Sequence, residues 1–244
     1  MRPPDAAFAD PRQAVLYDVF DDDRSDLDAY VEIVAAVAAS TVLDIGCGTG
    51  SLAVRLAAIG LDVVGVDPAA ASLDVARGKP GAQGVTWVHG DATTAADLGT
   101  SVDLAVMTGN VAQVFVADED WHRTLSAVRS CLRPEGWFVF ETRRPEVRDW
   151  ETWDVASTTV TLPDGASADF SRTVTEVALP LVMFESTTTI GGSARLRSAS
   201  TLRFRGRREV ERDLEDHGFE VVDVRGAPDR PGKELVFVSR RIEP

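Results

Sequence analysis

The sequence predicts an α/β fold in which a mostly parallel sheet carries helices on both faces and an antiparallel segment is inserted late in the chain. From about residue 41 to 142, short apolar runs alternate with segments whose apolar residues recur at helical spacing. These runs are nearly continuous in Val, Leu and Ile, which is typical of parallel strands covered on both faces. From about Arg144 to Arg205 the rhythm gives way to alternating segments rich in Thr, Ser and Val, which indicate antiparallel strands.

The first half of the chain predicts two helices that form an N-terminal cap, followed by four strands. Gly46 closes the first apolar run, Gly60 ends the helix after it, and Pro68 is well placed to open the next helix. The predicted elements are helices 11–20 and 26–39, strand 41–45, helix 51–59, strand 62–67, helix 69–77, and strands 85–89 and 102–107.

The second half predicts the rest of the sheet and the insert. Its core elements are helix 118–132, strand 136–141, helix 208–217, and strands 219–224 and 234–239. Segments 157–162, 170–179, 181–190 and 196–204 alternate, which predicts three or four antiparallel strands with turns at Pro163-Asp164-Gly165 and Gly191-Gly192. We therefore expect a core of residues 1–143 and 206–244, with the cap at 1–40, and an inserted subdomain at 144–205.

Composition narrows the classes of partner. The formal net charge of −14, from 25 basic and 39 acidic side chains, disfavours binding to a nucleic acid backbone. No apolar run approaches the length that crosses a bilayer and the N-terminus lacks a signal peptide's apolar core, so we expect a cytoplasmic protein. The two cysteines, Cys47 and Cys131, form neither a disulfide framework nor a metal-ligand spacing, and no metal is expected. The pattern leaves open whether the protein is a monomer or a homodimer.

The strongest motif runs from Val42 to Gly50, between the first strand and the helix after it, and reads V-L-D-I-G-C-G-T-G. Glycines at such a turn let a ligand lie against bare backbone. A dinucleotide fingerprint would read G-x-G-x-x-G, but here the third glycine arrives one residue early and Asp44 precedes the turn. An acid at this place favours a cationic group over a phosphate.

This stretch resembles the first motif of class I S-adenosylmethionine-dependent methyltransferases at every position. The resemblance covers about residues 40 to 142 and implies a Rossmann-like sheet of seven strands whose last strand is antiparallel. It also implies S-adenosyl-L-methionine as cofactor and S-adenosyl-L-homocysteine as product. The turn into the fifth strand departs from the family, because Glu135 replaces the first of two glycines.

The resemblance implies a set of cofactor-binding residues that follow the first four strands. An acid at Asp67 would bind the ribose hydroxyls, one at Asp91 the adenine amino group, and the turn at 108–110 would lie beside the methionine portion. The full set is Asp44, Gly46, Cys47, Gly48, Gly50, Asp67, Pro68, Asp91, Ala92, Thr108, Gly109 and Asn110. Strand-end solvation or helix capping is the alternative for each acid, but all three occur where one nucleoside needs them.

The insert leaves and re-enters the core at the carboxyl edge of the sheet, where ligands bind in such folds, so we expect it to form a lid over a small-molecule acceptor. Tyr17 and Arg24 of the cap are candidates for contacts with substrate or cofactor, although they could equally serve packing and solvation. Candidate residues of the insert in the acceptor pocket, which could instead build its own core, are Trp150, Trp153, Phe170, Met183 and Phe184.

In-line transfer from a sulfonium needs alignment more than a catalytic group, so no firm catalytic residue is assigned. A hydroxyl acceptor would require a general base, for which the candidates are Glu141, His122 and His89. Two other functions stay open at this point. The same fold could use S-adenosylmethionine for a reaction other than methylation, or the chain could be a nicotinamide-dependent oxidoreductase.

Overall fold

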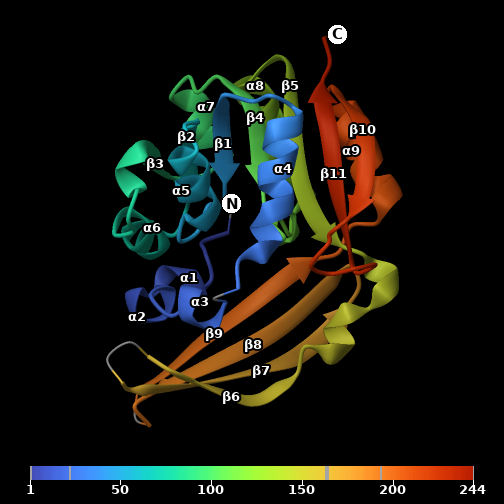
Figure 1. The fold of residues 1–244 in the computed structure, drawn as a ribbon. Helices are drawn as coiled ribbons and strands as arrows, with labels where there is room; N and C mark the ends of the chain where they lie inside the picture. The colour runs from blue at the N-terminus through green and yellow to red at the C-terminus, as the bar shows by residue number, and fades with distance from the viewer. Residues whose placement is uncertain (1, 22, 163–164, 193, 244) are drawn as a thin grey trace.

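The computed structural model describes residues 2–21, 23–162, 165–192 and 194–243, which form two sheets (Figure 1). The larger sheet has seven strands in the order β10-β11-β5-β4-β1-β2-β3. Its strands are β1 (Thr41–Ile45), β2 (Asp62–Asp67), β3 (Val85–His89), β4 (Val102–Met107), β5 (Leu132–Arg143), β10 (Phe219–Gly226) and β11 (Glu234–Arg241). β1 to β5 pair in parallel, while β11 runs antiparallel to both β5 and β10. The predicted Rossmann-like sheet is confirmed.

Helices cover both faces of this sheet because its strands alternate two sets of apolar side chains. Val42 of β1 belongs to the core cluster beneath α4 and α5, and its neighbour Leu43 belongs to the cluster beneath α7, α8 and α9. The helices are α4 (Asp28–Ala36), α5 (Ser51–Ala58), α6 (Ala70–Arg77), α7 (Ala92–Asp97), α8 (Asp118–Cys131) and α9 (Arg207–Asp216). α7 was not predicted, although Asp91 and Thr94 form a capping box at its start.

The N-terminal cap differs from the prediction of one helix at 11–20. Three short helices occur instead, and they are α1 (Ala6–Ala9), α2 (Pro11–Ala14) and α3 (Tyr17–Phe20). A new helix begins at Pro11, whose missing N–H group suits a first helical position, and the Asp10 side chain caps it by accepting from the Arg12 amide at 2.9 Å. The second predicted helix is shorter than expected, because a 3₁₀ turn (Ser25–Leu27) precedes α4.

The predicted antiparallel insert is confirmed as a second sheet of four strands in the order β6-β7-β8-β9. These strands are β6 (Val155–Thr161), β7 (Ser167–Ala178), β8 (Leu181–Ile190) and β9 (Ala194–Arg203), and two 3₁₀ turns (Pro145–Val147 and Asp149–Thr152) lead into them. Of the two predicted turns, the one at Gly191-Gly192 joins β8 to β9, while Pro163 and Asp164 of the other lie outside the described residues. The exact division of the chain into core and inserted subdomain stays a prediction.

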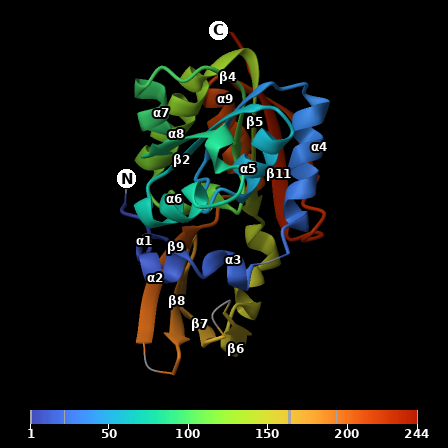
Figure 2. The ribbon, with the colours of Figure 1, turned by 60° about the vertical axis from the view of Figure 1, so that its left-hand side comes forward.

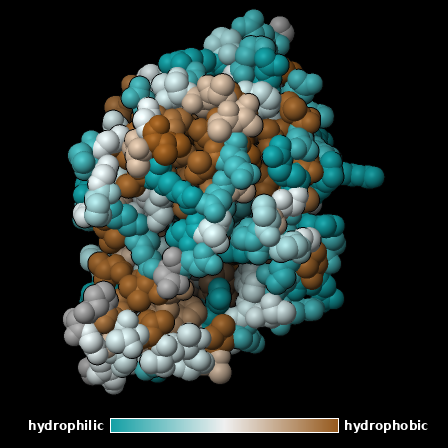
Figure 3. Space-filling model, viewed as in Figure 1, coloured by the Kyte–Doolittle hydropathy of each residue, from teal (hydrophilic) through white to brown (hydrophobic). Residues whose placement is uncertain are grey.

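Helices α1 to α3 lie between the two sheets in both ribbon views (Figures 1 and 2). They pack on the insert through Leu16, which contacts Leu162 and Ala168, and through the rings of Phe20 and Phe170, whose centroids are 5.3 Å apart. In the space-filling view hydrophobic residues gather around this junction at lower left (Figure 3). The N-terminal segment is therefore held against the core by a sheet formed from residues much later in the chain.

The turn into β5 shows how the chain accommodates its departure from the family pattern. Glu135 has φ +68°, a left-handed conformation that glycine adopts at no steric cost and other residues adopt at about 1–2 kcal/mol. Its carboxylate pairs with Arg240 of β11.

Within the described ranges, every helix is too short or too polar to span a lipid bilayer.

Candidate active site

A cavity lies at the carboxyl ends of β1, β2, β3 and β4, and its empty space, counted with its opening to solvent, is about 1270 Å³. It is lined by the turns after these strands, the 3₁₀ turn after β4 (Val111–Val114) and the N-terminal segment, with Ser51 and Leu52 of α5 and Ser72 of α6. The residues that line it include Asp44, Gly46, Cys47, Gly48, Asp67, Pro68, Asp91, Ala92, Thr108 and Gly109, together with Arg2, Pro3, Pro4, Asp5, Phe8, Tyr17, Arg24, Val111, Val114 and Phe115. Most of the predicted cofactor-binding residues thus meet in one place.

The glycine turn presents open backbone to this cavity. Gly48 has φ +54°, and a Cβ atom built on it would meet no protein atom within 4 Å, so only empty space faces it. Gly50 is different, because it begins α5 at φ +77° and its Cβ would lie 2.4 Å from the Trp87 ring. Gly50 therefore serves packing rather than lining the cavity, while Gly48 leaves room for a ligand against the main chain.

Two acids, Asp44 and Asp67, make this part of the cavity electronegative. Asp67 accepts from the Gly48 amide at 2.8 Å and from the Ala69 amide at 2.7 Å, and burial raises its pKa against these hydrogen bonds. Asp44 is 1% exposed, and its Oδ1 has no hydrogen-bond partner among the described residues. Burial, followed by the charge of Asp67, raises the pKa of Asp44 to about 7. A cation bound here would stabilise both carboxylates.

Asp91 both caps a helix and lines the cavity. Its Oδ1 accepts from the amides of Thr93 at 2.9 Å and Thr94 at 3.2 Å at the start of α7. Helix capping, the alternative that the sequence left open for Asp91, therefore occupies only Oδ1. Its Oδ2 has no protein partner in the described structure. His89, the base candidate two residues earlier, is exposed, contacts the Pro68 carbonyl at 3.0 Å through Nε2 and does not line the cavity.

The N-terminal segment forms one wall of the cavity and is fastened to the glycine turn. Asp18 of α3 accepts from the Thr49 hydroxyl at 2.6 Å and pairs with Lys79 at 2.7 Å. Lys79 also donates to Ser51, the first residue of α5, at 2.9 Å. Tyr17, next to Asp18, lines the cavity, and burial raises the pKa of its hydroxyl. The sequence analysis did not predict that residues 2–8 belong to this wall, because no motif marks them.

The turn after β4 is held from behind by buried polar side chains. Glu141 of β5 accepts from the Asn110 amide at 3.2 Å and from the Tyr30 hydroxyl. The Asn110 amide group donates to Glu234 of β11 at 2.8 Å, and Arg230 pairs with the same Glu234 oxygen at 2.7 Å. The Asn110 side chain consequently points away from the cavity, although Thr108 and Gly109 line it.

Glu141 is not placed as a catalytic base. It does not line the cavity, both of its oxygens accept hydrogen bonds, and burial followed by the charge of Glu234 raises its pKa. The structure also places His122 elsewhere, because its ring stacks on that of His217 with centroids 5.0 Å apart, between α8 and the end of α9. None of the three candidate bases contacts the cavity.

The insert's candidate residues do not line the cavity either. Trp150 and Trp153 are buried with Val182 and Phe204 in the insert's own core, which is the alternative that the sequence left open. Among the described residues, none from β6 to β9 lines the cavity, because helices α1 to α3 lie in between. This corrects the expectation that Trp150, Trp153, Met183 and Phe184 reach it. The insert supports the N-terminal wall.

Comparisons with known proteins agree with this geometry. A family model described as a methyltransferase domain matches residues 42–136. An uncharacterized methyltransferase of Mycobacterium tuberculosis is 37% identical over 111 residues, which are 43% of this chain and 41% of that protein. A ubiquinone biosynthesis O-methyltransferase of Cereibacter sphaeroides is 38% identical over 102 residues, 41% of this chain and 40% of that protein. The match thus spans less than half the length of these relatives.

Solved structures extend the likeness to nearly the whole fold. A sugar N-methyltransferase from Streptoalloteichus aligns with a TM-score of 0.77 at 18% identity and covers 93% of each chain. An amino pentose methyltransferase from Micromonospora echinaspora, solved with S-adenosylmethionine bound, aligns with a TM-score of 0.71 at 23% identity, over 90% of this chain and 93% of its own. At these identities the likeness shows the shared fold, including the inserted sheet.

Proposed function

Since the chain has the fold and the domain signature of class I S-adenosylmethionine-dependent methyltransferases, we propose that it transfers a methyl group from S-adenosylmethionine to a small-molecule acceptor by in-line displacement. The observation that carries this proposal is the cavity itself. One end is formed by the family's glycine turn and three acids, and the other end is enclosed by the N-terminal segment. When bound, the cofactor supplies an electrophilic methyl group on a sulfonium.

The residues at the strand ends fit this cofactor. The unpartnered, buried Oδ1 of Asp44 is an acceptor suited to the ammonium of the methionine portion. Each oxygen of Asp67 has one protein donor and a second lone pair for a ribose hydroxyl. Asp91 offers its free Oδ2 to the adenine amino group, and Gly48 leaves space against the main chain. We assign these four residues to cofactor binding.

The lining of the cavity favours a small acceptor. The cavity extends from the glycine turn to the N-terminal segment, so a compact molecule bound beside the cofactor would contact that segment. Val114 and Phe115, which follow β4, and Phe8 and Tyr17 of the N-terminal segment all line the cavity. We propose that these walls exclude water and align the acceptor's nucleophilic atom, which is the main requirement of a displacement reaction.

The location of the protein in the cytoplasm stays a prediction.

The structural relatives named as sugar and amino pentose methyltransferases support a polar small molecule as acceptor. A nicotinamide cofactor is disfavoured, because its pyrophosphate would lie beside Asp44 and Asp67. A reaction of S-adenosylmethionine other than methylation requires the same binding site and differs only in its product.

Calorimetry tests cofactor binding first, and mass spectrometry then tests methyl transfer. The purified protein should bind S-adenosylhomocysteine with a dissociation constant of about 1–100 µM and show no heat with NADH. Incubation with S-adenosylmethionine and a panel of amino and hydroxyl compounds, amino sugars included, should then yield S-adenosylhomocysteine and an acceptor heavier by one methyl group. Gly48→Val is the matched negative variant. Binding of NADH instead would overturn the cofactor assignment, and cleavage of the cofactor without a methylated product would overturn methyl transfer.

A further inference from the structure

The inserted sheet carries a cation whose surroundings the core function does not explain. Arg172 of β7 lies between two aromatic rings, with its guanidinium carbon 5.7 Å from the ring centre of Phe170 and 5.7 Å from that of Phe184. Phe170 precedes it by two residues on the same strand, and Phe184 lies on the neighbouring strand β8. Because side chains alternate along a strand, these three residues share one face of the sheet.

Arg172 has no acidic partner in the described part of the chain, since none of the carboxylates there forms an ion pair with it. Its Nε is buried without a hydrogen bond. Burial lowers its pKa, and the more distant charge of Asp149 offsets this only in part. Arg143, which stacks on Trp153 at 5.1 Å, is likewise half-buried, but it has an acidic partner because it pairs with Glu234. A partly desolvated guanidinium with unmet donors favours an anionic ligand.

The face that carries Arg172 is the one turned toward the cofactor side. In the sheet register Arg172 is opposite Ser186 of β8, and Ser186 is opposite Ser198 of β9, so the three form one row. The Ser198 hydroxyl accepts from the Ala7 amide at 2.9 Å, and Ala7 lies between cavity-lining residues of the N-terminal wall. Since neighbouring strands are about 4.8 Å apart, Arg172 is about 10 Å from this contact.

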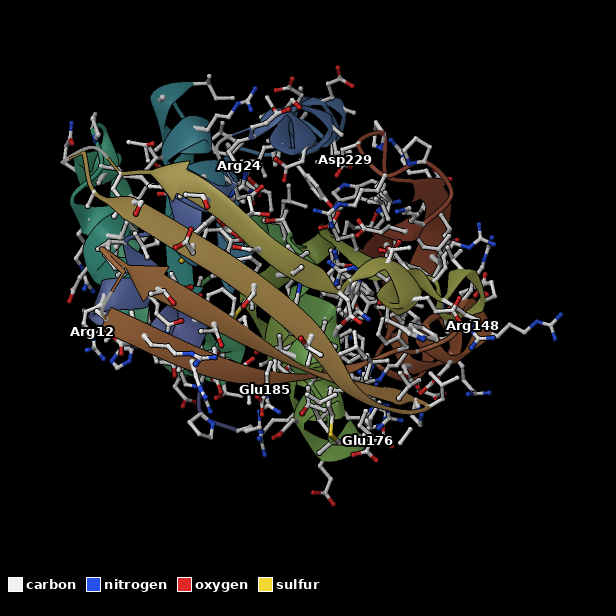
Figure 4. All side chains as sticks on the ribbon, turned by 90° about the horizontal axis from the view of Figure 1, so that it is seen from below. Arg12, Arg24, Arg148, Glu176, Glu185 and Asp229 are labelled. Atoms are coloured by element: carbon white, nitrogen blue, oxygen red, sulfur yellow. The ribbon has the colours of Figure 1, made fainter. Side chains whose placement is uncertain are left out.

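The other face of the insert points away from the core. Viewed from below, it lies toward the reader and carries Glu185, the neighbour of Phe184 along β8, while Arg24 lies beyond the β6 edge of the sheet (Figure 4). Arg197 belongs to this outward face because it alternates with Ser198, and it is exposed. A ligand at Arg172 would therefore lie between the insert and the core.

We propose that Arg172 binds a small anionic ligand through a phosphate or a carboxylate group. Phe170 and Phe184 hold the guanidinium plane, and the Ser186 hydroxyl, which has no partner among the described residues, is a second donor to the same group. This anion site is separate from the cofactor cavity, which none of the described residues of β6 to β9 lines. It lies on the face of the insert that packs against the N-terminal wall.

Small anions test the site without knowledge of its natural ligand. Inorganic phosphate and acetate are titrated separately, at constant ionic strength, into protein loaded with S-adenosylhomocysteine, and the melting temperature is followed. At least one anion should stabilise the wild type, and which of the two does so distinguishes phosphate from carboxylate recognition. Arg172→Gln should raise the anion concentration at half-effect about tenfold to a hundredfold, as expected for loss of a charge-assisted pair. Arg172→Lys should restore part of the effect.

Arg197→Gln, which removes an exposed arginine from the outward face, is the matched control and should behave as wild type. Equal anion responses in wild type and Arg172→Gln, or an equal loss in Arg197→Gln, would overturn the proposal. S-adenosylhomocysteine affinity is measured on the same samples and should not change in either variant. Failure of the wild type to bind S-adenosylhomocysteine would instead overturn the proposed function, so the two failures are distinguishable.

Discussion

Replacing Asp44 by asparagine removes the buried carboxyl group that faces the proposed ammonium site. Burial, followed by the charge of Asp67, raises the pKa of Asp44 from 3.8 to about 7 in the free protein. A shift of about 3 units corresponds to about 4 kcal/mol of differential stability between the two protonation states. Because the native carboxyl keeps its proton to higher pH than the unfolded one, the free energy of unfolding falls as pH rises from about 4 to 7 and is flat above.

In Asp44→Asn the free energy of unfolding should not fall in this way as pH rises. The variant without ligand should therefore gain stability relative to wild type as pH rises, and the difference should widen by about 3 kcal/mol between pH 5 and pH 8. For a chain of this size, that is a relative rise of about 6–12 °C in melting temperature. Urea unfolding of both proteins at several pH values in that range measures it. Asp103→Asn is the control, because burial at Asp103 is outweighed by hydrogen bonds from Ser40 and Thr41 that lower its pKa, so its removal should give no trend in this range.

Binding should change in the opposite direction. At pH 8, Asp44→Asn should weaken S-adenosylhomocysteine binding about tenfold to a hundredfold, because a charge-assisted hydrogen bond is lost. Wild-type affinity should fall about tenfold from pH 8 to pH 6 as Asp44 takes up its proton, and the variant should show no such fall. Isothermal titration calorimetry provides both values. If the variant binds as tightly as wild type at pH 8, or if its stability follows the wild-type pH curve, Asp44 is not the cation-binding acid.

Three further outcomes are expected. Gly48→Ala should reduce S-adenosylhomocysteine affinity at least tenfold. Gly99 has a similar φ of +72° and the same open surroundings but lies outside the cavity, so Gly99→Ala should cost only about 1–2 kcal/mol of stability. Equal effects of the two variants on binding would contradict the role of Gly48. Asp18→Asn should weaken cofactor binding about threefold to tenfold and expose residues 2–20 to limited proteolysis, because the contact of Asp18 with Thr49 fastens that segment. Unchanged proteolysis would show that the insert alone holds the segment. Glu234→Gln should lower thermal stability by about 1–3 kcal/mol with little change in S-adenosylhomocysteine affinity, since it acts behind the wall of the cavity; a loss in affinity alone would place it in direct contact.

The parallel half of the fold was predictable because its signals are local. Each strand from β1 to β4 is an apolar run that ends in a turn, and the acids Asp44, Asp67 and Asp91 directly follow or close these runs. In a parallel sheet the carboxyl ends of strands share one edge, so sequence positions translate directly into a common place in space. The antiparallel last strand β11 came from the family resemblance and not from any pattern of its own residues.

The acceptor side was less predictable because long-range packing determines it. Whether Trp150 and Trp153 line a cavity or fill a core depends on the position of helices α1 to α3, about 140 residues earlier in the chain. The wall formed by residues 2–8 carries no motif, and its position depends on contacts such as Ala7 with Ser198. Asn110 follows the family pattern in sequence, but Glu234, which turns its side chain away from the cavity, is 124 residues further on.

The contact between Ala7 and Ser198 spans 191 residues, and it has a consequence for how the protein matures on the ribosome. Chain synthesis proceeds from the N-terminus, so the first twenty residues emerge long before the strand that will hold them exists. The parallel strands and their glycine turn can assemble meanwhile, which leaves the nascent domain with an uncovered ligand site. Closure of that site is therefore completed late, because a chain interrupted before β9 would keep the Asp18 contacts of its wall but lack the support of the insert.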